Sequence, residues 1–261
     1  MKKVLIILFA LTPIFLMAQN TSGVIHYEEV MKMKIELSPE MKQYAHLIPT
    51  EQRVNMSLTF NESESIYEKG VEIKEAEKDP FEGSGMQVET MMIGGPGSAV
   101  VYSNLTDKKI LRSEDTFGKK FLIDSDWSEI EWKMLAEQKD ILGYMCMKAE
   151  AVTDSTSLTV WFTPQIPLAF GPSEFNGLPG VILAMDYTQD GADISINATK
   201  VEMKESVEIK KPSKGKKVSE GAYRKIVDDR LKEMNMMGGG ENSVKEEDGN
   251  IEIRISTGSG N

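Results

Sequence analysis

Apolar and polar residues alternate with a period of two in the first part of the chain. One face collects Ile25, Tyr27, Met31, Met33, Ile35 and Leu37, and only Glu29 interrupts it. Successive side chains of a β-strand point to opposite faces, so this alternation predicts a long, half-buried antiparallel strand with one wet side. The same alternation returns at residues 54–60.

Short apolar runs continue along the chain, spaced by about ten residues. They occupy residues 65–67, 100–102, 109–111, 121–123, 130–134, 144–152, 158–163, 181–187 and 194–198. Turn residues separate them, and Asp190-Gly191 between two apolar runs is typical of a hairpin. The pattern predicts a mainly β protein, a single-domain curved antiparallel sheet that forms a half-open barrel.

One segment near the C-terminus has helical spacing instead. Ser219 is a suitable N-cap, and the three glycines at 238–240 end the pattern. Between them the apolar positions are Tyr223, Ile226, Val227, Leu231 and Met234. We expect a C-terminal amphipathic helix that docks on the open side of the sheet. The basic stretch before it, residues 210–217, is interpreted as a solvated linker.

After Met1 the chain has two lysines and then an apolar run that ends before Ala18. This arrangement predicts a signal peptide over residues 1–18, because the run is shorter than the roughly 20 residues of a membrane span. Residues 19–261 are then expected to form a single β-rich domain, periplasmic or secreted. Within it, we expect a mobile glycine-rich insertion at about 70–98 and a flexible tail from about 238.

The net charge restricts the classes of binding partner, and the cysteine content restricts the possible disulfides. A formal net charge of −11 argues against nucleic acid and against anionic membrane surfaces. Cys146 is the only cysteine, so the chain has no internal disulfide. Its neighbours Met145 and Met147 indicate a buried and inert thiol.

One set of motifs carries a resemblance to a known family. The chain reads Gly177-Leu178-Pro179-Gly180-Val181-Ile182, and agreement extends to residues 139–149, 161–163, 166–167 and 171–172. These residues resemble the GLPGLI family of exported bacterial proteins, with Val181 as a conservative departure in the name-giving motif. The resemblance implies a β-rich cell-envelope protein without an established activity, in some members associated with outer-membrane transporters.

The proline- and glycine-rich connection around this motif is the candidate site. Pro179-Gly180 predicts a type II turn, in which Gly180 supplies the positive φ. A rigid structural turn would explain the motif by itself. Alternatively, rigid apolar groups on this connection line a pocket mouth or contact an extended peptide. The expected ligand- or partner-binding residues are Trp161, Phe170, Phe175, Leu178 and Pro179.

The sequence contains no recognisable catalytic constellation. Its adjacent carboxylates are interpreted as solvated surface, and no glycine-rich loop has the signature of a nucleotide site. We therefore predict a non-catalytic accessory or binding module without a cofactor. Its partner would be an outer-membrane transporter, another envelope protein, or an apolar or peptide ligand. The alternative is a copper-binding protein, because the chain has 17 methionines and thioethers favour soft metals.

Overall fold

The computed structural model describes residues 21–33, 50–70, 97–127, 129–153, 156–189, 191–237, 244–247 and 250–253. One 12-stranded sheet dominates, with the strand order β12-β6-β5-β4-β3-β2-β1-β11-β10-β9-β8-β7. Its first half comprises β1 (Ser22–Met33), β2 (Glu51–Phe60), β3 (Glu64–Lys69), β4 (Ala99–Asn104), β5 (Lys109–Thr116) and β6 (Lys119–Asp126). Its second half comprises β7 (Lys133–Ile141), β8 (Tyr144–Thr153), β9 (Thr156–Thr163), β10 (Val181–Gln189), β11 (Ala192–Lys204) and β12 (Lys216–Ser219).

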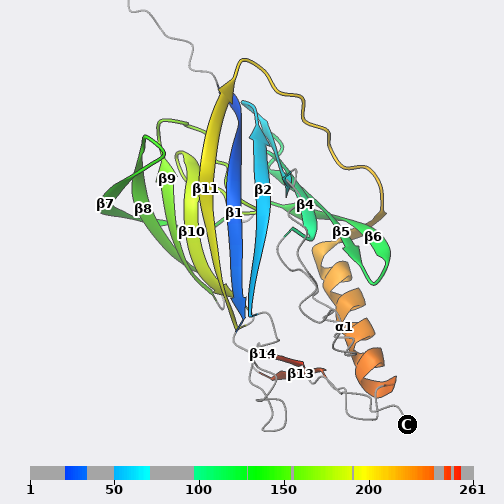
Figure 1. Ribbon diagram of the computed structural model, residues 1–261. Coiled ribbons are helices and arrows are strands. Elements are labelled where there is room, and N and C mark those ends of the chain that lie inside the picture. Colours follow the sequence, from blue (N-terminus) through cyan, green and yellow to red (C-terminus); the bar gives the residue numbers. More distant parts are fainter. Residues whose placement is uncertain are drawn as a thin grey trace, which may run out of the picture.

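The sheet is curved and open, as the alternation predicted (Figure 1). It consists of two meanders, β1 to β6 and β7 to β11, in which each strand pairs antiparallel with the next. The pairing of β1 with β11 joins the two meanders, from Ser22↔Lys204 to Met33↔Ala192. The N-terminal strand therefore lies in the middle of the sheet.

The connection between β6 and β7 explains why the sheet curls. These strands lie near opposite ends of the strand order, with β6 next to the edge strand β12 and β7 at the other edge, yet only residues 127–132 connect them. A chain advances at most about 3.5 Å per residue, so the two ends lie within roughly 25 Å of each other. A flat sheet of this width would hold its edge strands farther apart, because neighbouring strands lie about 4.8 Å apart.

The inner face of the curved sheet carries the main hydrophobic core. Its largest fully buried side chains include Ile25, Tyr27, Leu58, Phe60 and Phe162. Glu29 belongs to this face and is buried as well, and the Tyr67 hydroxyl donates to its carboxylate at 3.2 Å. Burial raises the pKa of Glu29, and the hydrogen bond from Tyr67 offsets part of that effect. The interruption in the alternating pattern is thus a buried carboxyl group.

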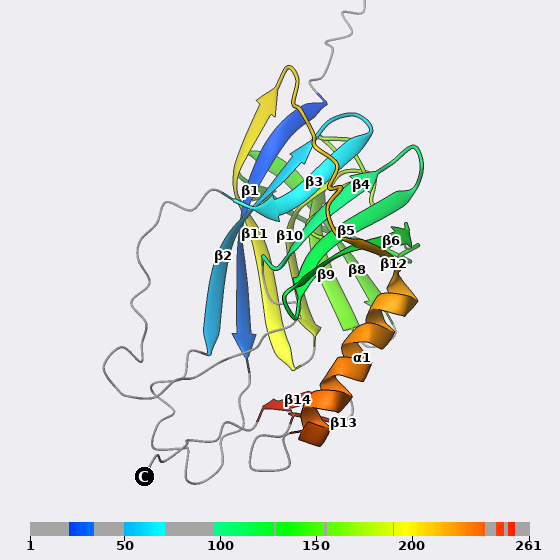
Figure 2. The ribbon, with the colours of Figure 1, turned by 90° about the vertical axis from the view of Figure 1, so that its right-hand side faces the viewer.

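The C-terminal helix α1 (Glu220–Met237) begins where its sequence predicts. The Ser219 hydroxyl accepts a hydrogen bond from the Ala222 amide at 3.3 Å, which confirms the N-cap. Helix α1 packs through Tyr223 and its neighbours against the β6–β12 end of the sheet, where Phe121 and Ile123 are buried, and the Tyr223 hydroxyl lies 2.7 Å from the Thr116 hydroxyl of β5. Its far end projects beyond the strands (Figures 1 and 2). The expectation that it crosses the open side of the sheet is therefore wrong.

Two strands differ from their predictions. The strand expected at 130–134 begins at Lys133 and runs to Ile141, along the exposed edge of the sheet. Strand β12, which the sequence presents as part of a linker, pairs in parallel with β6 from Lys216↔Phe121 to Ser219↔Asp124. A separate two-stranded hairpin contains β13 (Val244–Glu247) and β14 (Asn250–Ile253).

Several sequence-based predictions lie outside the described residues. They are the signal peptide at 1–18, residues 71–96 of the expected insertion, and residues 238–243, 248–249 and 254–261 of the expected tail. Among the helices of the described ranges, none is long and apolar enough to cross a membrane.

Candidate functional site

The proline-rich segment, residues 164–180, fills the inside of the curved sheet. Its apolar side chains at Ile166, Leu168, Phe170 and Leu178 are buried in the main core. Two backbone hydrogen bonds tie it to the start of β10, from Val181 to Ile166 at 3.0 Å and from Ile182 to Phe170 at 3.1 Å. The segment therefore takes the place inside the sheet that was expected for the helix.

Aromatic contacts hold the segment from two sides. The Trp132 indole donates to the Asn176 carbonyl at 2.8 Å, which anchors the connection between β6 and β7. On the other side, the rings of Phe175 and Tyr187 meet at a centroid distance of 5.3 Å. The segment is thus fixed between the β6–β7 connection and strand β10.

Arg112 on β5 links this segment to helix α1. Its guanidinium lies 2.6 Å from Glu174 of the segment, 3.0 Å from Glu220 of α1 and 3.2 Å from Glu114. Desolvation opposes the charge of Arg112, but the surrounding carboxylates, with Glu174 first, outweigh it and raise the pKa of the guanidinium. One cation therefore holds three parts of the fold together.

The Pro179-Gly180 turn differs from its prediction. Gly180 does not have a positive φ, whereas Gly177 has a φ of 92°. Glycine is required at 180 for a different reason, since a Cβ there would lie 2.2 Å from the Thr163 carbonyl oxygen. The type II turn is therefore wrong, and the motif instead allows the start of β10 to approach the end of β9.

The structure divides the five predicted binding residues into three groups by their burial. Phe170 and Leu178 are each only 1% exposed, so they belong to the core. Phe175 is half-buried against Tyr187, and Trp161 is half-buried with the Lys139 ammonium 4.2 Å from its ring centroid. Pro179 is exposed. Pro179 is therefore the most accessible of the five.

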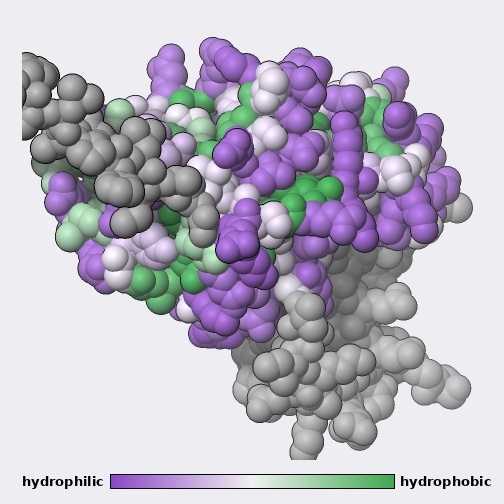
Figure 3. All heavy atoms as spheres, turned by 90° about the horizontal axis from the view of Figure 1, so that it is seen from above, coloured by the Kyte–Doolittle hydropathy of each residue, from purple (hydrophilic) through white to green (hydrophobic). Residues whose placement is uncertain are grey.

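An exposed apolar surface lies at the same end of the sheet, where β9 ends and β10 begins. We call it the hairpin–proline surface, and it comprises Leu142, Met145, Pro164 and Pro179. Leu142 and Met145 are 47% and 48% exposed, although both are large apolar residues. Seen from above, hydrophobic surface is confined to small patches among hydrophilic residues (Figure 3).

The β7–β8 turn presents Leu142 in an unusual conformation. Leu142 and Gly143 both have positive φ, 56° and 85°, as a type I′ turn requires. Asn or Gly is the usual residue at the first of these positions, and a bulky side chain in this region is uncommon. The Asp140 carboxylate accepts a hydrogen bond from the Gly143 amide at 3.1 Å and fixes the turn.

Hydrogen bonds hold the two parts of the hairpin–proline surface together. The Met145 amide donates to the Gln165 side chain at 2.8 Å, and the Thr163 hydroxyl donates to the Met145 carbonyl at 3.0 Å. These contacts connect the β7–β8 hairpin to the beginning of the proline-rich segment. Leu142 was not among the residues predicted from the sequence. Its position directly before Gly143, between two strands, could have indicated a hairpin turn with an exposed side chain.

The described titratable groups offer little reactive chemistry. Cys146 is buried, and burial raises the pKa of its thiol to about 11, so the thiol is protonated at neutral pH. His26 is half-buried, and its imidazole lies 3.8 Å from the Glu202 carboxylate. Within the ranges that the structure describes, no group of three His, Cys, Asp or Glu residues is placed to hold a metal ion.

The fold and this site define a β-rich domain with a curled open sheet and a rigid segment folded into it. Residues 88–225 match the family PNGase_F-II_N, described as the N-terminal domain of the N-glycanase peptide. The match covers more than half of the sequence, and the chain belongs to this family.

Solved structures that match part of this chain include PNGF-II in two space groups. In the P21 form the identity is 14% and the TM-score 0.49, over 79% of this chain and 33% of PNGF-II. In the C2 form the TM-score is 0.48 at 14% identity, over 78% and 32%. LprF from Mycobacterium bovis has a TM-score of 0.27 at 11% identity, over 76% and 92%. This chain spans about a third of the PNGF-II chain. No curated protein matches the sequence.

Proposed function

We propose that this chain is an exported, non-catalytic binding module of the cell envelope that holds an extended polypeptide at the hairpin–proline surface. The proposal includes membership of the GLPGLI family, on the motif between Gly177 and Ile182. An outer-membrane transporter or another envelope protein would supply the bound segment, or a glycoprotein would be captured for an N-glycanase.

The conformation of Leu142 is the observation that carries the proposal. A large apolar side chain there is half-exposed to water and occupies a φ that favours Asn or Gly. Both features cost stability, and residues in such conformations concentrate at functional sites. Binding a partner would remove the apolar side chain from water and offset that cost.

The surroundings of Leu142 favour an extended peptide over a small ligand bound in a deep pocket. Met145 and two exposed prolines form an apolar strip beside it, in which the prolines are the rigid members, whereas Phe170 and Leu178 are buried within the core. Rigid apolar groups contact a partner with little loss of conformational entropy. The family name adds the class of partner to test first, because an N-glycanase acts on N-glycosylated protein.

The experiment measures binding of the purified chain to an unfolded N-glycosylated protein and to the same protein without its glycans. Equal binding to both is the expected result, because the proposed contact is with polypeptide. Leu142→Asn should reduce that binding at least about tenfold by removing an apolar anchor. The same variant should unfold at a higher denaturant concentration, because Asn tolerates the left-handed conformation better.

Phe117→Asn provides the matched control. Phe117-Gly118 forms the corresponding turn between β5 and β6, with φ values of 52° and 69°, at the opposite end of the sheet. This variant should leave binding unchanged. Undiminished binding by Leu142→Asn would place the contact elsewhere, and dependence on the glycans would replace the peptide with a carbohydrate ligand. Binding to neither form would refute the proposal.

A further inference from the structure

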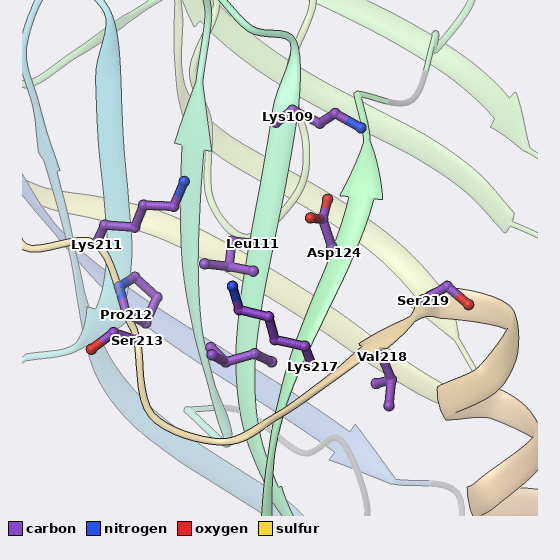
Figure 4. Close-up of a pocket in the computed structure, with 10 residues that line it drawn as sticks. Lys109, Leu111, Asp124, Lys211, Pro212, Ser213, Lys217, Val218 and Ser219 are labelled. Atoms are coloured by element: carbon purple, nitrogen blue, oxygen red, sulfur yellow. The ribbon is translucent and has the colours of Figure 1, made fainter.

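A groove lies on the outer face of the sheet, away from the proline-rich segment. Its volume is about 700 Å³, and its lining includes Lys109, Leu111, Asp124, Lys211 and Lys217. Strands β5 and β6 contribute the base, because Leu111 and Leu122 alternate with residues that face the inner core. The chain between β11 and β12 forms the opposite wall (Figure 4).

The wall is attached to the sheet by a glycine. Gly215 has a φ of 131°, and a Cβ there would lie 3.0 Å from the Lys120 carbonyl oxygen. This close approach allows β12 to pair with β6, and Lys217 aligns with Leu122 in that pairing. Lys217 therefore extends from a regular strand, and its side chain reaches across the groove toward Leu111 (Figure 4).

The charge of the groove opposes that of the whole protein. The chain carries a net charge of −11, but three lysines and one aspartate line this groove. Lys109 is paired with Asp126 at 2.5 Å, and the Lys211 ammonium lies 5.1 Å from the centroid of the Tyr102 ring. The Lys217 ammonium makes no hydrogen bond or ion pair with any described residue.

The base of the groove is apolar. Leu111 is half-buried between the lysines, Leu122 is fully buried beneath it, and Pro212 adds apolar surface from the wall. An apolar base with ammonium groups above it suits a ligand that has both an apolar body and a negative head. A volume of about 700 Å³ lies in the usual range of small-molecule sites, roughly 300–1,000 Å³.

We propose that this groove binds a single anionic amphiphile, whose oxyanion head contacts Lys211 and Lys217 while its apolar body covers Leu111. Lysine ammonium groups serve as point charges for phosphate and carboxylate oxygens. The site takes one ligand molecule and not a membrane surface, since the net negative charge of the protein repels an anionic bilayer. It is separate from the hairpin–proline surface and does not depend on the function proposed there.

Isothermal titration calorimetry with decyl phosphate, kept below its micelle-forming concentration, tests this proposal. Decyl maltoside supplies the same apolar body without charge, and inorganic phosphate supplies the head alone. Decyl phosphate should bind most tightly of the three, and its affinity should fall as salt is added. Equal affinity for decyl phosphate and decyl maltoside would overturn the role of the lysines.

Single substitutions locate the site. Lys217→Gln and Lys211→Gln should each weaken decyl phosphate binding about tenfold, as expected for the loss of one charge-assisted contact. Lys214→Gln changes an exposed lysine of the same connection that does not line the groove, and should leave the affinity unchanged. Equal losses in all three variants would show non-specific attraction. Binding to phosphatidylglycerol vesicles without binding to monomeric decyl phosphate would also refute the proposal.

Discussion

Replacing Arg112 with Met should destabilise the protein more than any exposed charge substitution. Removing one partner of a buried ion pair costs about 3–5 kcal/mol, because the other charge remains without compensation. In the variant, the Glu114 carboxylate would stay buried without its cation, because its side chain is only 7% exposed. The side chains of Glu174 and Glu220 are 31% exposed, so water can hydrate them instead. We therefore expect the free energy of unfolding to fall by about 3 kcal/mol, the lower end of this range.

Urea unfolding followed by tryptophan fluorescence measures this loss. A decrease of about 3 kcal/mol in the free energy of unfolding lowers the urea midpoint by about 1–3 M, given slopes of roughly 1–3 kcal/mol per M. The double variant Arg112→Met/Glu114→Gln should recover part of the stability, because it removes the buried negative charge. Arg53→Met, which changes an exposed arginine that pairs with Glu51 and Glu28, should leave the midpoint unchanged.

Two results would refute this reasoning. If Arg112→Met lowers the free energy of unfolding by less than about 1 kcal/mol, the ion pairs of Arg112 contribute no more than ordinary surface ion pairs. No recovery in the double variant would mean that lost packing of Arg112, and not the stranded carboxylate, causes the destabilisation.

Three further predictions concern single buried groups. Gly180→Ala should lower the free energy of unfolding in urea by about 3 kcal/mol, because the added Cβ would lie 2.2 Å from the Thr163 carbonyl oxygen. Gly221→Ala is the control, since a Cβ there meets nothing within 4 Å and should not destabilise the protein. Cys146, whose buried thiol has its pKa raised to about 11, should react with a disulfide reagent at pH 8 only after unfolding, and rapid native reaction would contradict its burial. Burial also raises the pKa of Glu29, so native stability should fall as pH rises from about 4.5 through the folded-state pKa. Glu29→Gln should remove that fall, and an unchanged pH profile would assign it to other groups.

The sequence predicted the elements whose signals are local. Alternation identified β1 and β2 because one side of each strand is buried and the other is wet. Helix α1 followed from an N-cap and from apolar residues at helical spacing, which depend on neighbours within a few positions. The burial of Cys146 followed from its apolar neighbours in the same way.

Features that depend on distant residues were not predictable. Strand β7 has exposed residues on both faces, so its sequence lacks the alternation of a half-buried strand. Strand β12 depends on the close approach of Gly215 to β6, which no local pattern encodes. Arg112 meets Glu174 and Glu220, which are 62 and 108 residues away in sequence. For the same reason, the inward path of the proline-rich segment could not be distinguished from an exposed connection.

The central position of β1 has a consequence for folding. One of its neighbours, β2, follows within the next 30 residues, but the other, β11, ends at Lys204. The two meanders can each form early. The two halves of the sheet join only after β11 is available to pair with β1. Contacts so distant in sequence slow folding, because the loop entropy is lost before the pairing forms. Until β11 arrives, one long side of β1 has unpaired backbone groups, and aggregation during refolding should begin there.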